Sequence, residues 1–375
     1  MANLPEELIT KIISHLPVKS LLRFRCVCKA WNSLINDTTF IQMHLHQAIK
    51  SNNFNIMLSL SLVHSIDYDT HYTKAVELDH PYKIIDDDIA VYGTSNGLVY
   101  IQVDGFILDV LWNPCTKEFK ILPESPCVSD DFMVFHLHGF GYNPVTDDYR
   151  VVKVYQFFNE NEEFISSQVM IYSLRMDSWK MVDGPPYFVS SDSQLPMNEN
   201  PHWPAYAHPD VRLPKSIAYF DLADEFFCEI QFPKRVGNIV DVGVLGGCLC
   251  IVGGLEESRS DVWVMKEHGV LESWTKLFTI NSSTVIRSVK PLALLFFDKN
   301  GKVLINNRCG DIVLYDLKCD TAEALEIQGL PTSWCGIHAY VGSLVSVKSG
   351  LFVDREKSSG KRRQNKKRGS TEINN

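Results

Sequence analysis

The sequence lacks the marks of a secreted, membrane-spanning or redox-active protein. None of its ten cysteines forms a C-x-x-C pair and most lie within apolar runs, which favours reduced thiols in the cytosol or nucleus. No apolar stretch approaches the ~20 residues of a membrane helix, because the run from Leu292 to Phe297 has only the length of a buried strand. No basic region with a continuous apolar run precedes Leu4, so we expect no signal peptide. We therefore expect a cytoplasmic or nuclear protein without membrane contact.

Patterns of catalytic and ligand-binding residues are also missing. His136 and His138 alternate and would share one face of a strand, but no carboxylate or thiol at a suitable spacing completes a metal site. The glycines of Gly243–Gly247 are not followed by Lys and Ser or Thr, so they do not form a phosphate-binding loop. Asp147 and Asp148 are adjacent and would point to opposite faces of a strand. We expect no enzyme activity, no cofactor and no metal.

The charge of the chain is acidic, with a formal net value of −9. Residues 361–375 hold six Lys or Arg and one Glu, so the rest of the chain carries a formal charge of −14. An acidic body disfavours nucleic acid and favours a basic partner. We expect residues 351–375 to form a disordered basic tail, which is either a nuclear-import signal or a solvated segment that aids solubility.

The first 48 residues predict a small helical unit. Pro5 stands beside the first helical position, and Leu8, Ile12 and Leu16 recur at helical spacing before Pro17 ends the helix. Further short helices are predicted from Ser20 and from Val27 or Cys28, and then a fourth from Asp37 or Thr38. A unit of about 45 residues buries too little surface to be stable alone. It therefore completes its core against a partner, or it is a helical cap on the next domain.

After Ile49 the chain becomes a series of short strands with an internal repeat. Six segments share an aromatic residue, a polar turn and a second strand, and their aromatics are spaced by a mean of about 49 residues: Tyr68, Trp112, Tyr172, Phe220, Trp263 and Tyr315. A period near 50 residues with strands only is typical of a kelch-type β-propeller. We predict about six blades, with Leu344–Val347 closing the ring against the first blade. The alternative is a pair of packed sheets with accidental similarity between their turns.

The stretch from Leu4 to Trp31 resembles an F-box of the plant variety, with the run Leu-Pro-Val-Lys-Ser-Leu-Leu-Arg-Phe-Arg at its centre. The resemblance implies docking to a Skp-type adaptor and, through it, to a cullin-RING ubiquitin ligase. The residues that fall on the family's motif are Leu4, Pro5, Leu8, Ile12, Leu16, Pro17, Leu21, Leu22, Phe24, Val27, Cys28 and Trp31. Which of them face the adaptor and which fill the helical core is left open.

Four later segments resemble the plant F-box-associated interaction domain: residues 111–123, 139–154, 171–180 and 262–278. The chain is thus similar to the large F-box/kelch group that includes the S-locus F-box proteins of pollen. The resemblance implies an α+β multidomain chain, with an all-β propeller after the helices. We assign residues 1–48 to the F-box, 49–350 to the propeller-like domain and 351–375 to the tail.

Together these features predict a non-catalytic substrate receptor of an SCF-type ubiquitin ligase, in which the F-box holds the adaptor and the propeller holds a target protein for degradation. On this interpretation, removal of residues 1–48 abolishes adaptor binding and leaves the β domain folded. The alternatives are a propeller-fold enzyme with a helical cap and an adaptor-bound scaffold that delivers no target.

The segment from Ser190 to Pro209 departs from the family pattern and interrupts the repeats. It contains several prolines and polar residues, which argue against an ordinary central strand. We therefore expect Trp203 and Tyr206 to be exposed on a stiff loop, where aromatic side chains are suited to anchoring a target. The alternative is a surface insertion that packs its Trp back onto the blade.

Overall fold

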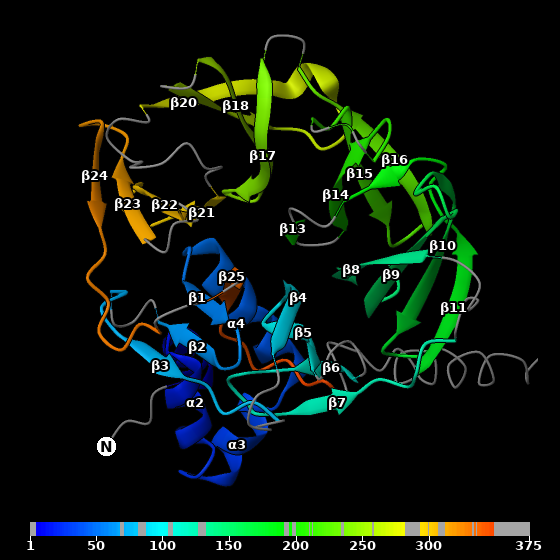
Figure 1. Ribbon diagram of the computed structural model, residues 1–375. Coiled ribbons are helices and arrows are strands. Elements are labelled where there is room, and N and C mark those ends of the chain that lie inside the picture. The colour runs from blue at the N-terminus through cyan, green and yellow to red at the C-terminus, as the bar shows by residue number, and fades with distance from the viewer. Residues whose placement is uncertain are drawn as a thin grey trace, which may run out of the picture.

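In the computed structural model, four short helices precede six small sheets that are arranged in a ring (Figure 1). The helices are α1 (Glu6–Ile13), α2 (Val18–Phe24), α3 (Lys29–Ile35) and α4 (Thr38–Lys50). The structure describes residues 5–67, 71–81, 88–103, 108–126, 133–190, 195–196, 200–209, 211, 213–233, 236–256, 259–281, 293–298, 300–306, 312–331, 334 and 336–348. The expected basic tail lies outside them. The prediction of an F-box-like helical unit followed by a six-bladed propeller is confirmed.

The helices begin where the sequence supplies the right residues. Pro5 and Pro17 occupy the N-cap positions of α1 and α2, where φ is −53° and −56°, so the second helix begins two residues before the predicted Ser20. Asp37 caps α4, because its Oδ1 accepts the N–H groups of Thr39 and Phe40 at 2.9 and 3.2 Å. The predicted domain boundary after residue 48 falls inside the last turn of α4.

Each blade is an antiparallel sheet. The strand orders are β25-β1-β2-β3, β4-β5-β6-β7, β11-β10-β9-β8, β12-β14-β15-β16 with β13 also on β14, β17-β18-β19-β20 and β21-β22-β23-β24. The strands are β1 (Phe54–Ser59), β2 (Val63–Ile66), β3 (Ala75–Glu77), β4 (Ile89–Ser95), β5 (Leu98–Val103), β6 (Leu108–Trp112), β7 (Phe119–Ile121), β8 (Met133–Asn143), β9 (Asp148–Phe158), β10 (Phe164–Ser173), β11 (Ser178–Asp183), β12 (Phe188–Val189), β13 (Leu195–Pro196), β14 (Pro201–Tyr206), β15 (Ser216–Asp221), β16 (Phe226–Gln231), β17 (Asn238–Leu245), β18 (Cys248–Glu256), β19 (Arg259–Met265), β20 (Trp274–Asn281), β21 (Ala293–Phe297), β22 (Val303–Asn306), β23 (Ile312–Asp316), β24 (Thr321–Ala324) and β25 (Gly336–Val341). We call these sheets blades 1 to 6, starting with the sheet that contains β1.

The repeated sequence pattern corresponds to the outer hairpin of the blades. In several hairpins an Asn or Asp closes the turn by accepting two backbone N–H groups, as Asn113 and Asp221 do through Oδ1. Where the aromatic residue before the turn is a tyrosine, its hydroxyl can also hydrogen-bond to the turn. The Tyr172 hydroxyl donates to Asp177 at 2.6 Å, and Tyr315 donates in the same way to Asp320. The spacing of aromatic and acidic residues therefore reflects turn chemistry as well as the blade core.

The ring is closed by joining the two ends of the propeller in one blade. β25 pairs antiparallel with β1, from Phe54 opposite Val341 to Ser59 opposite Gly336. The prediction that Leu344–Val347 closes the ring was therefore wrong in position. That segment follows the closing strand and is held from the side, because the Asn113 amide donates to the carbonyls of Ser343 and Val345 at 3.2 and 2.7 Å. Its apolar side chains are buried because they pack with side chains of the helices.

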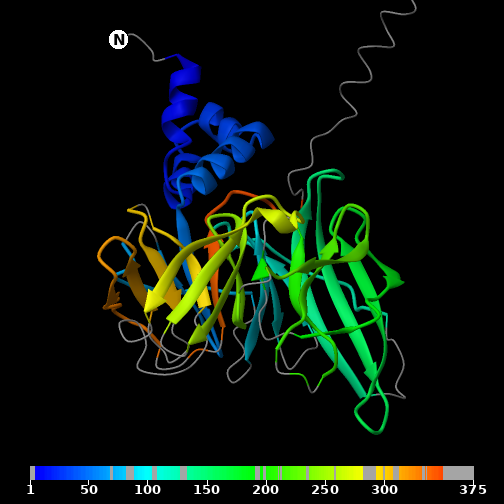
Figure 2. The same ribbon diagram turned by 90° about the horizontal axis from the view of Figure 1, so that it is seen from above.

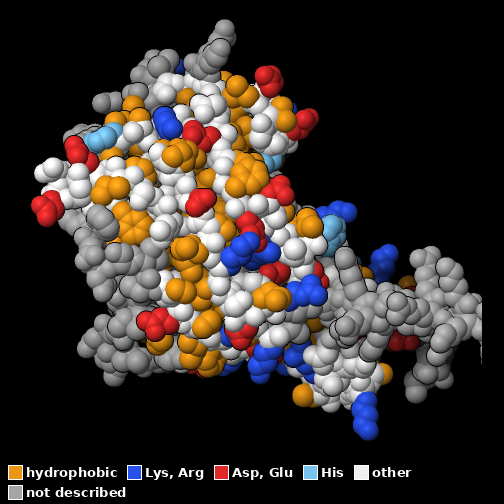
Figure 3. All heavy atoms as spheres, turned by 90° about the vertical axis from the view of Figure 1, so that its right-hand side faces the viewer, with side chains coloured by type: hydrophobic (Ala, Val, Ile, Leu, Met, Phe, Trp, Pro, Cys, Tyr) orange, Lys and Arg blue, Asp and Glu red, His pale blue; other side chains and the backbone are white. Residues whose placement is uncertain are grey.

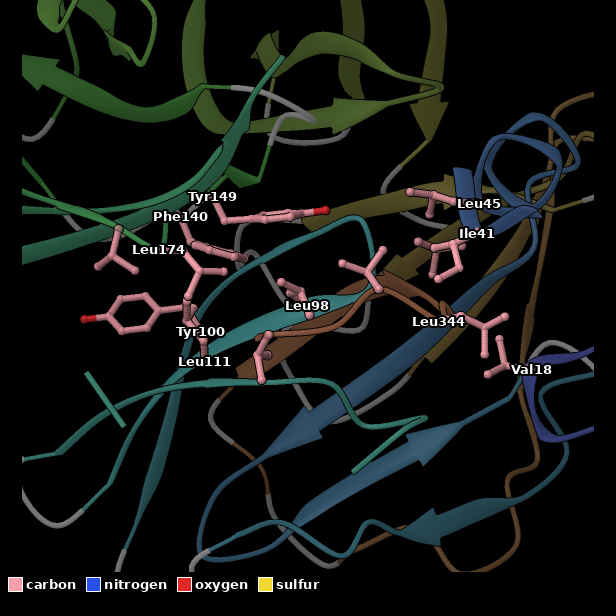
Figure 4. Close-up of a cluster of buried hydrophobic side chains, with 14 of the residues drawn as sticks. Val18, Ile41, Leu45, Leu98, Tyr100, Leu111, Phe140, Tyr149, Leu174 and Leu344 are labelled. Carbon is pink, nitrogen blue, oxygen red and sulfur yellow. The ribbon is translucent and has the colours of Figure 1, made fainter. Parts of the chain in front are cut away.

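The helices and the propeller share one hydrophobic cluster. Val18, Ile41 and Leu45 of the helices belong to the same cluster as Leu344 and Val345 of the C-terminal segment. Figure 4 shows the side chains of Val18 and Leu344 close together, and those of Ile41 and Leu45 above them. Figure 2 shows the consequence, with all four helices standing on one rim of the ring. On the opposite rim, the described residues form no α-helix.

Candidate adaptor and target surfaces

The N-terminal helices have an apolar inner face and an apolar outer face. Ile13 and Leu21 are 2% and 0% exposed and lie in the shared core. Leu8 and Ile12 are 47% and 57% exposed, and Val27 in the turn between α2 and α3 is 61% exposed. Leu8 and Ile12 are four residues apart, so they lie on the same side of α1. Soluble monomers seldom display neighbouring large aliphatic side chains without a partner.

The structure divides the motif residues between these two faces. Among the described residues, the exposed members are Pro5, Leu8, Ile12, Pro17, Val27 and Cys28; the half-buried members are Leu16, Leu22, Phe24 and Trp31; and Leu21 is fully buried. Phe24 and Trp31 pack edge to face with their ring centroids 5.3 Å apart. Leu4 lies outside the described residues. The exposed set is therefore available to a partner, while the remaining motif residues hold the helices together.

One residue of the helical unit was missed by the sequence analysis. His44 of α4 is 5% exposed, and its Nε2 donates to the Leu16 carbonyl at 2.9 Å. Burial lowers the pKa of the His44 imidazole, so the ring is neutral and carries its proton on Nε2. This bond joins α4 to the end of the first helical segment. A lone histidine at an inward helical position was the only signal for it.

The structure places Trp203 and Tyr206 inside blade 4, not on an exposed loop. Both belong to β14, whose six residues are all buried, and they are 1% and 9% exposed. The Trp203 indole packs on Phe227 with 5.7 Å between ring centroids, and its Nε1 donates to the His138 carbonyl at 3.3 Å. The expectation that these aromatics are exposed was therefore wrong. They belong to the blade core and are not exposed to a target.

Prolines fit in this strand because the neighbouring strand is interrupted. β12 and β13 both pair with the same edge of β14, so the innermost strand of blade 4 consists of two short pieces. The Pro204 carbonyl still accepts the N–H of Ser190 at 3.1 Å. The sheet therefore loses only the hydrogen bond that a backbone N–H at this position would donate. The segment that departs from the family pattern thus forms the divided inner strand and β14. Blade 4 still has a strand at each of the four positions of the sheet.

A buried polar network joins blades 2 and 3. Asp109 of β6 accepts hydrogen bonds from Tyr100 at 2.6 Å, from Gln102 at 2.9 Å and from the Lys153 ammonium at 2.5 Å. His138 Nδ1 lies 2.9 Å from the Tyr100 hydroxyl, which donates to Asp109, so His138 is the donor in that contact. Burial is the main cause of two pKa shifts in this network. It lowers the pKa of His138 well below the usual value for histidine, and it raises the pKa of Tyr100 well above the usual value for tyrosine.

The network does not supply a metal site. His138 is 2% exposed while His136 is exposed, and the described residues contain no group of three His, Cys, Asp or Glu side chains that could hold a metal ion. The nearby Lys153 also opposes a cation. The arrangement is a charged, hydrogen-bonded link between two blades, and sequence spacing gave no indication of it because its residues come from four different strands.

The four-helix unit and the six-bladed ring are the two parts of an F-box protein with an F-box-associated propeller. The F-box domain family matches residues 1–42, and the F-box associated beta propeller domain family matches residues 40–347. The chain belongs to this family of F-box proteins. Among the described residues, no helix is long and apolar enough to cross a membrane.

Similar proteins are found in the plant Arabidopsis thaliana. The chain is 32% identical to "F-box protein CPR1", over 92% of this chain and 89% of that protein. It is 31% identical to "F-box/kelch-repeat protein At3g23880", over 77% of this chain and 82% of that protein. It is 26% identical to "F-box protein At4g22390", over 88% and 87%. The predicted resemblance to plant F-box/kelch proteins is confirmed.

Proposed function

We propose that this protein is the substrate-recognition subunit of an SCF-type ubiquitin ligase. Its F-box docks a Skp-type adaptor, and its propeller holds a target protein for ubiquitination and degradation. The observation that carries the proposal is the exposure of three aliphatic side chains on the helical unit, those of Leu8, Ile12 and Val27. These side chains fall on the F-box motif and are left uncovered by the propeller.

In this role the chain holds the target protein in position, and its own residues form or break no covalent bond. The helices are fixed to the propeller through a shared core, so an adaptor bound to the helices has a set orientation relative to the ring. Holding a target lysine near a ubiquitin-charged enzyme raises the effective concentration of the two groups. The chain therefore acts as a non-catalytic receptor that needs neither a cofactor nor a metal of its own.

The compartment proposed from the sequence is the cytoplasm, the nucleus or both. The described cysteines, which include the buried Cys250 and the exposed Cys26 and Cys28, are all free thiols. Burial raises the pKa of the Cys115 thiol to about 11, so it stays protonated at neutral pH. Free thiols of this kind suit a reducing compartment.

The adaptor proposal is tested by co-purification with a Skp-type adaptor. Replacing Leu8, Ile12 and Val27 together by Ser should weaken adaptor binding by at least roughly tenfold, as loss of buried interface side chains does. The melting temperature should not change, because these side chains are exposed in the free chain. A matched variant carries Ser at Met176 and Met181, which are 72% and 61% exposed on the propeller, and should bind normally. Undiminished adaptor binding by the triple variant would overturn the proposal.

A further inference from the structure

Blade 3 has the longest strands of the described blades, and it projects on the rim opposite the four helices. Its strands β8, β9 and β10 have 11, 11 and 10 residues, whereas β14, β15 and β16 of the next blade have six each. At about 3.3 Å per residue, four or five additional residues extend a strand by roughly 13–17 Å. Figure 2 shows the hairpin of β9 and β10 projecting away from the helices. We call residues 133–136 and 155–168 the blade-3 overhang.

The tip of the overhang is a closed turn. Asn159 Oδ1 accepts the N–H groups of Asn161 and Glu163 at 3.0 and 2.9 Å, and its Nδ2 donates to the Glu163 carboxylate at 2.8 Å. Glu162 adopts the left-handed conformation with φ of 63°. A surface built on paired strands and a hydrogen-bonded turn loses little conformational entropy when a partner binds.

The overhang carries exposed apolar side chains near a cluster of aromatic rings. Phe158 is 3% exposed, and its ring centroid lies 5.1 Å from that of Phe135 and 5.9 Å from those of Phe164 and Phe188. Phe135 itself is 55% exposed. Ile165 is 49% exposed and is the extra residue at a β-bulge between Phe164 and Ser166. A β-bulge changes the direction in which a side chain leaves the strand.

Acidic side chains lie in the turn that joins Phe158 of β9 to Phe164 of β10. Glu160, Glu162 and Glu163 are all exposed in the turn, and the overhang contains no Arg or Lys. Within the described part of the chain, Glu160 and Glu162 form no ion pair. Figure 3 shows that acidic and hydrophobic side chains are both exposed on the side of the molecule that lies at the right in Figure 1. The combination fits a ligand that carries both positive charge and apolar bulk, and it repels phosphate groups of nucleic acids and anionic lipids.

We propose that the blade-3 overhang binds a segment of the target protein in which a Lys or Arg neighbours an aromatic or aliphatic side chain. The apolar side chain covers Phe135 and Ile165, and the cation pairs with Glu160 and Glu162. This inference rests on the proposed function, since it names the target-binding surface of the same receptor. It also places the target on the rim opposite the adaptor, where the two partners do not compete for space.

The inference is tested with the full-length chain and a phage-displayed library of random dodecapeptides. Enriched peptides should combine Lys or Arg with neighbouring aromatic or aliphatic residues. Synthetic copies should bind the charge variant Glu160→Lys with Glu162→Lys, and the apolar variant Phe135→Ser with Ile165→Ser, at least roughly tenfold more weakly than the parent. Raising the salt concentration should weaken binding to the parent chain.

Two matched variants control for charge and for apolar surface on the helix-bearing rim. Glu267→Lys with Glu272→Lys makes the same change of charge, and Val270→Ser with Leu271→Ser removes side chains that are each 40% exposed. Both should bind the peptides like the parent. The charge variant alters no packed side chain, so it keeps the test decisive if the apolar variant proves unstable.

The outcomes separate this inference from the proposed function. Absence of enriched peptides, enrichment without basic residues, or basic-apolar peptides that bind the charge variant undiminished would each overturn the inference. Adaptor binding is measured on the same preparations. A chain that binds the adaptor but not such peptides overturns the overhang alone, whereas a chain that binds the peptides but no adaptor overturns the ligase role.

Discussion

At the scale of single residues, neighbouring positions of a helix have different tasks. Ile12 and Ile13 are adjacent in the sequence, but one is 57% exposed and the other 2%. Successive residues are about 100° apart around a helix of 3.6 residues per turn, so the same aliphatic type is exposed at one position and buried in the core at the next. The motif therefore reveals which residues matter, and only the packed structure reveals what each one contacts.

Trp203 provides a test of the corrected interpretation of blade 4. Its side chain is 1% exposed and packs in the cluster shared by blades 3 and 4. Trp203→Ala should destabilise the protein by about 3–5 kcal/mol, because it leaves a large cavity. Urea unfolding of the full chain measures the loss. A control at Met176, which is 72% exposed, should leave the unfolding midpoint unchanged, and a Trp203 variant as stable as the parent would contradict burial of this indole.

His202 predicts a dependence of stability on pH. Its Nε2 lies 3.0 Å from that of His268, and burial followed by the nearby His268 lowers the pKa of His202 to about 3. In the unfolded chain the pKa is about 6.5. The unfolded state therefore binds a proton more readily, so the contribution to stability is complete above pH 6.5 and is lost as the pH falls toward 3.

The loss for one such histidine is about 1.4 kcal/mol for each pH unit below 6.5. Urea unfolding at pH 7, 5.5 and 4.5 should show a smaller decrease for His202→Gln than for the parent. His46→Gln, at an exposed position of α4, serves as the control and should follow the parent. Identical slopes for parent and His202→Gln would show that His202 does not resist protonation in the folded state.

At the scale of elements, the sequence predicted the outer hairpins better than the inner strands. Aromatic and Asx residues of the turns form local contacts, such as Tyr172 with Asp177, and local contacts leave a repeated pattern. The divided inner strand of blade 4 and the buried strand β14 have no such pattern, because their pairing depends on residues distant in sequence. The blade-3 overhang was missed because strand length beyond the ring is visible only by comparison with the neighbouring blades.

Ring closure by β25 can be tested by truncation. A chain that ends at residue 335 lacks the strand that pairs with β1 and exposes that strand's edge, so it should aggregate or fail to unfold cooperatively. A chain that ends at residue 348 keeps β25 and the bonds from Asn113, and it should melt like the full chain. Both chains are compared with the full chain by circular dichroism. A cooperatively folded chain ending at 335 would show that β25 is not required.

At the scale of the whole molecule, the F-box and the propeller cannot be separated without cost. The sequence led us to expect that removal of residues 1–48 leaves the β domain folded. The structure changes this expectation, because Val18, Ile41 and Leu45 cover the apolar segment that contains Leu344 and Val345. Uncovering a large apolar side chain costs roughly 1.5–3 kcal/mol.

Deletion of residues 1–48 should therefore lower the melting temperature of the propeller and increase binding of a dye for apolar surface, besides abolishing adaptor binding. The triple Ser variant at Leu8, Ile12 and Val27 should weaken adaptor binding as stated above while leaving both other readouts unchanged, because the three native side chains are exposed. Only the second variant separates the adaptor interface from the fold. If the deleted chain melts at the temperature of the parent, the shared cluster does not stabilise the ring, and the fixed orientation of adaptor and target must have another origin.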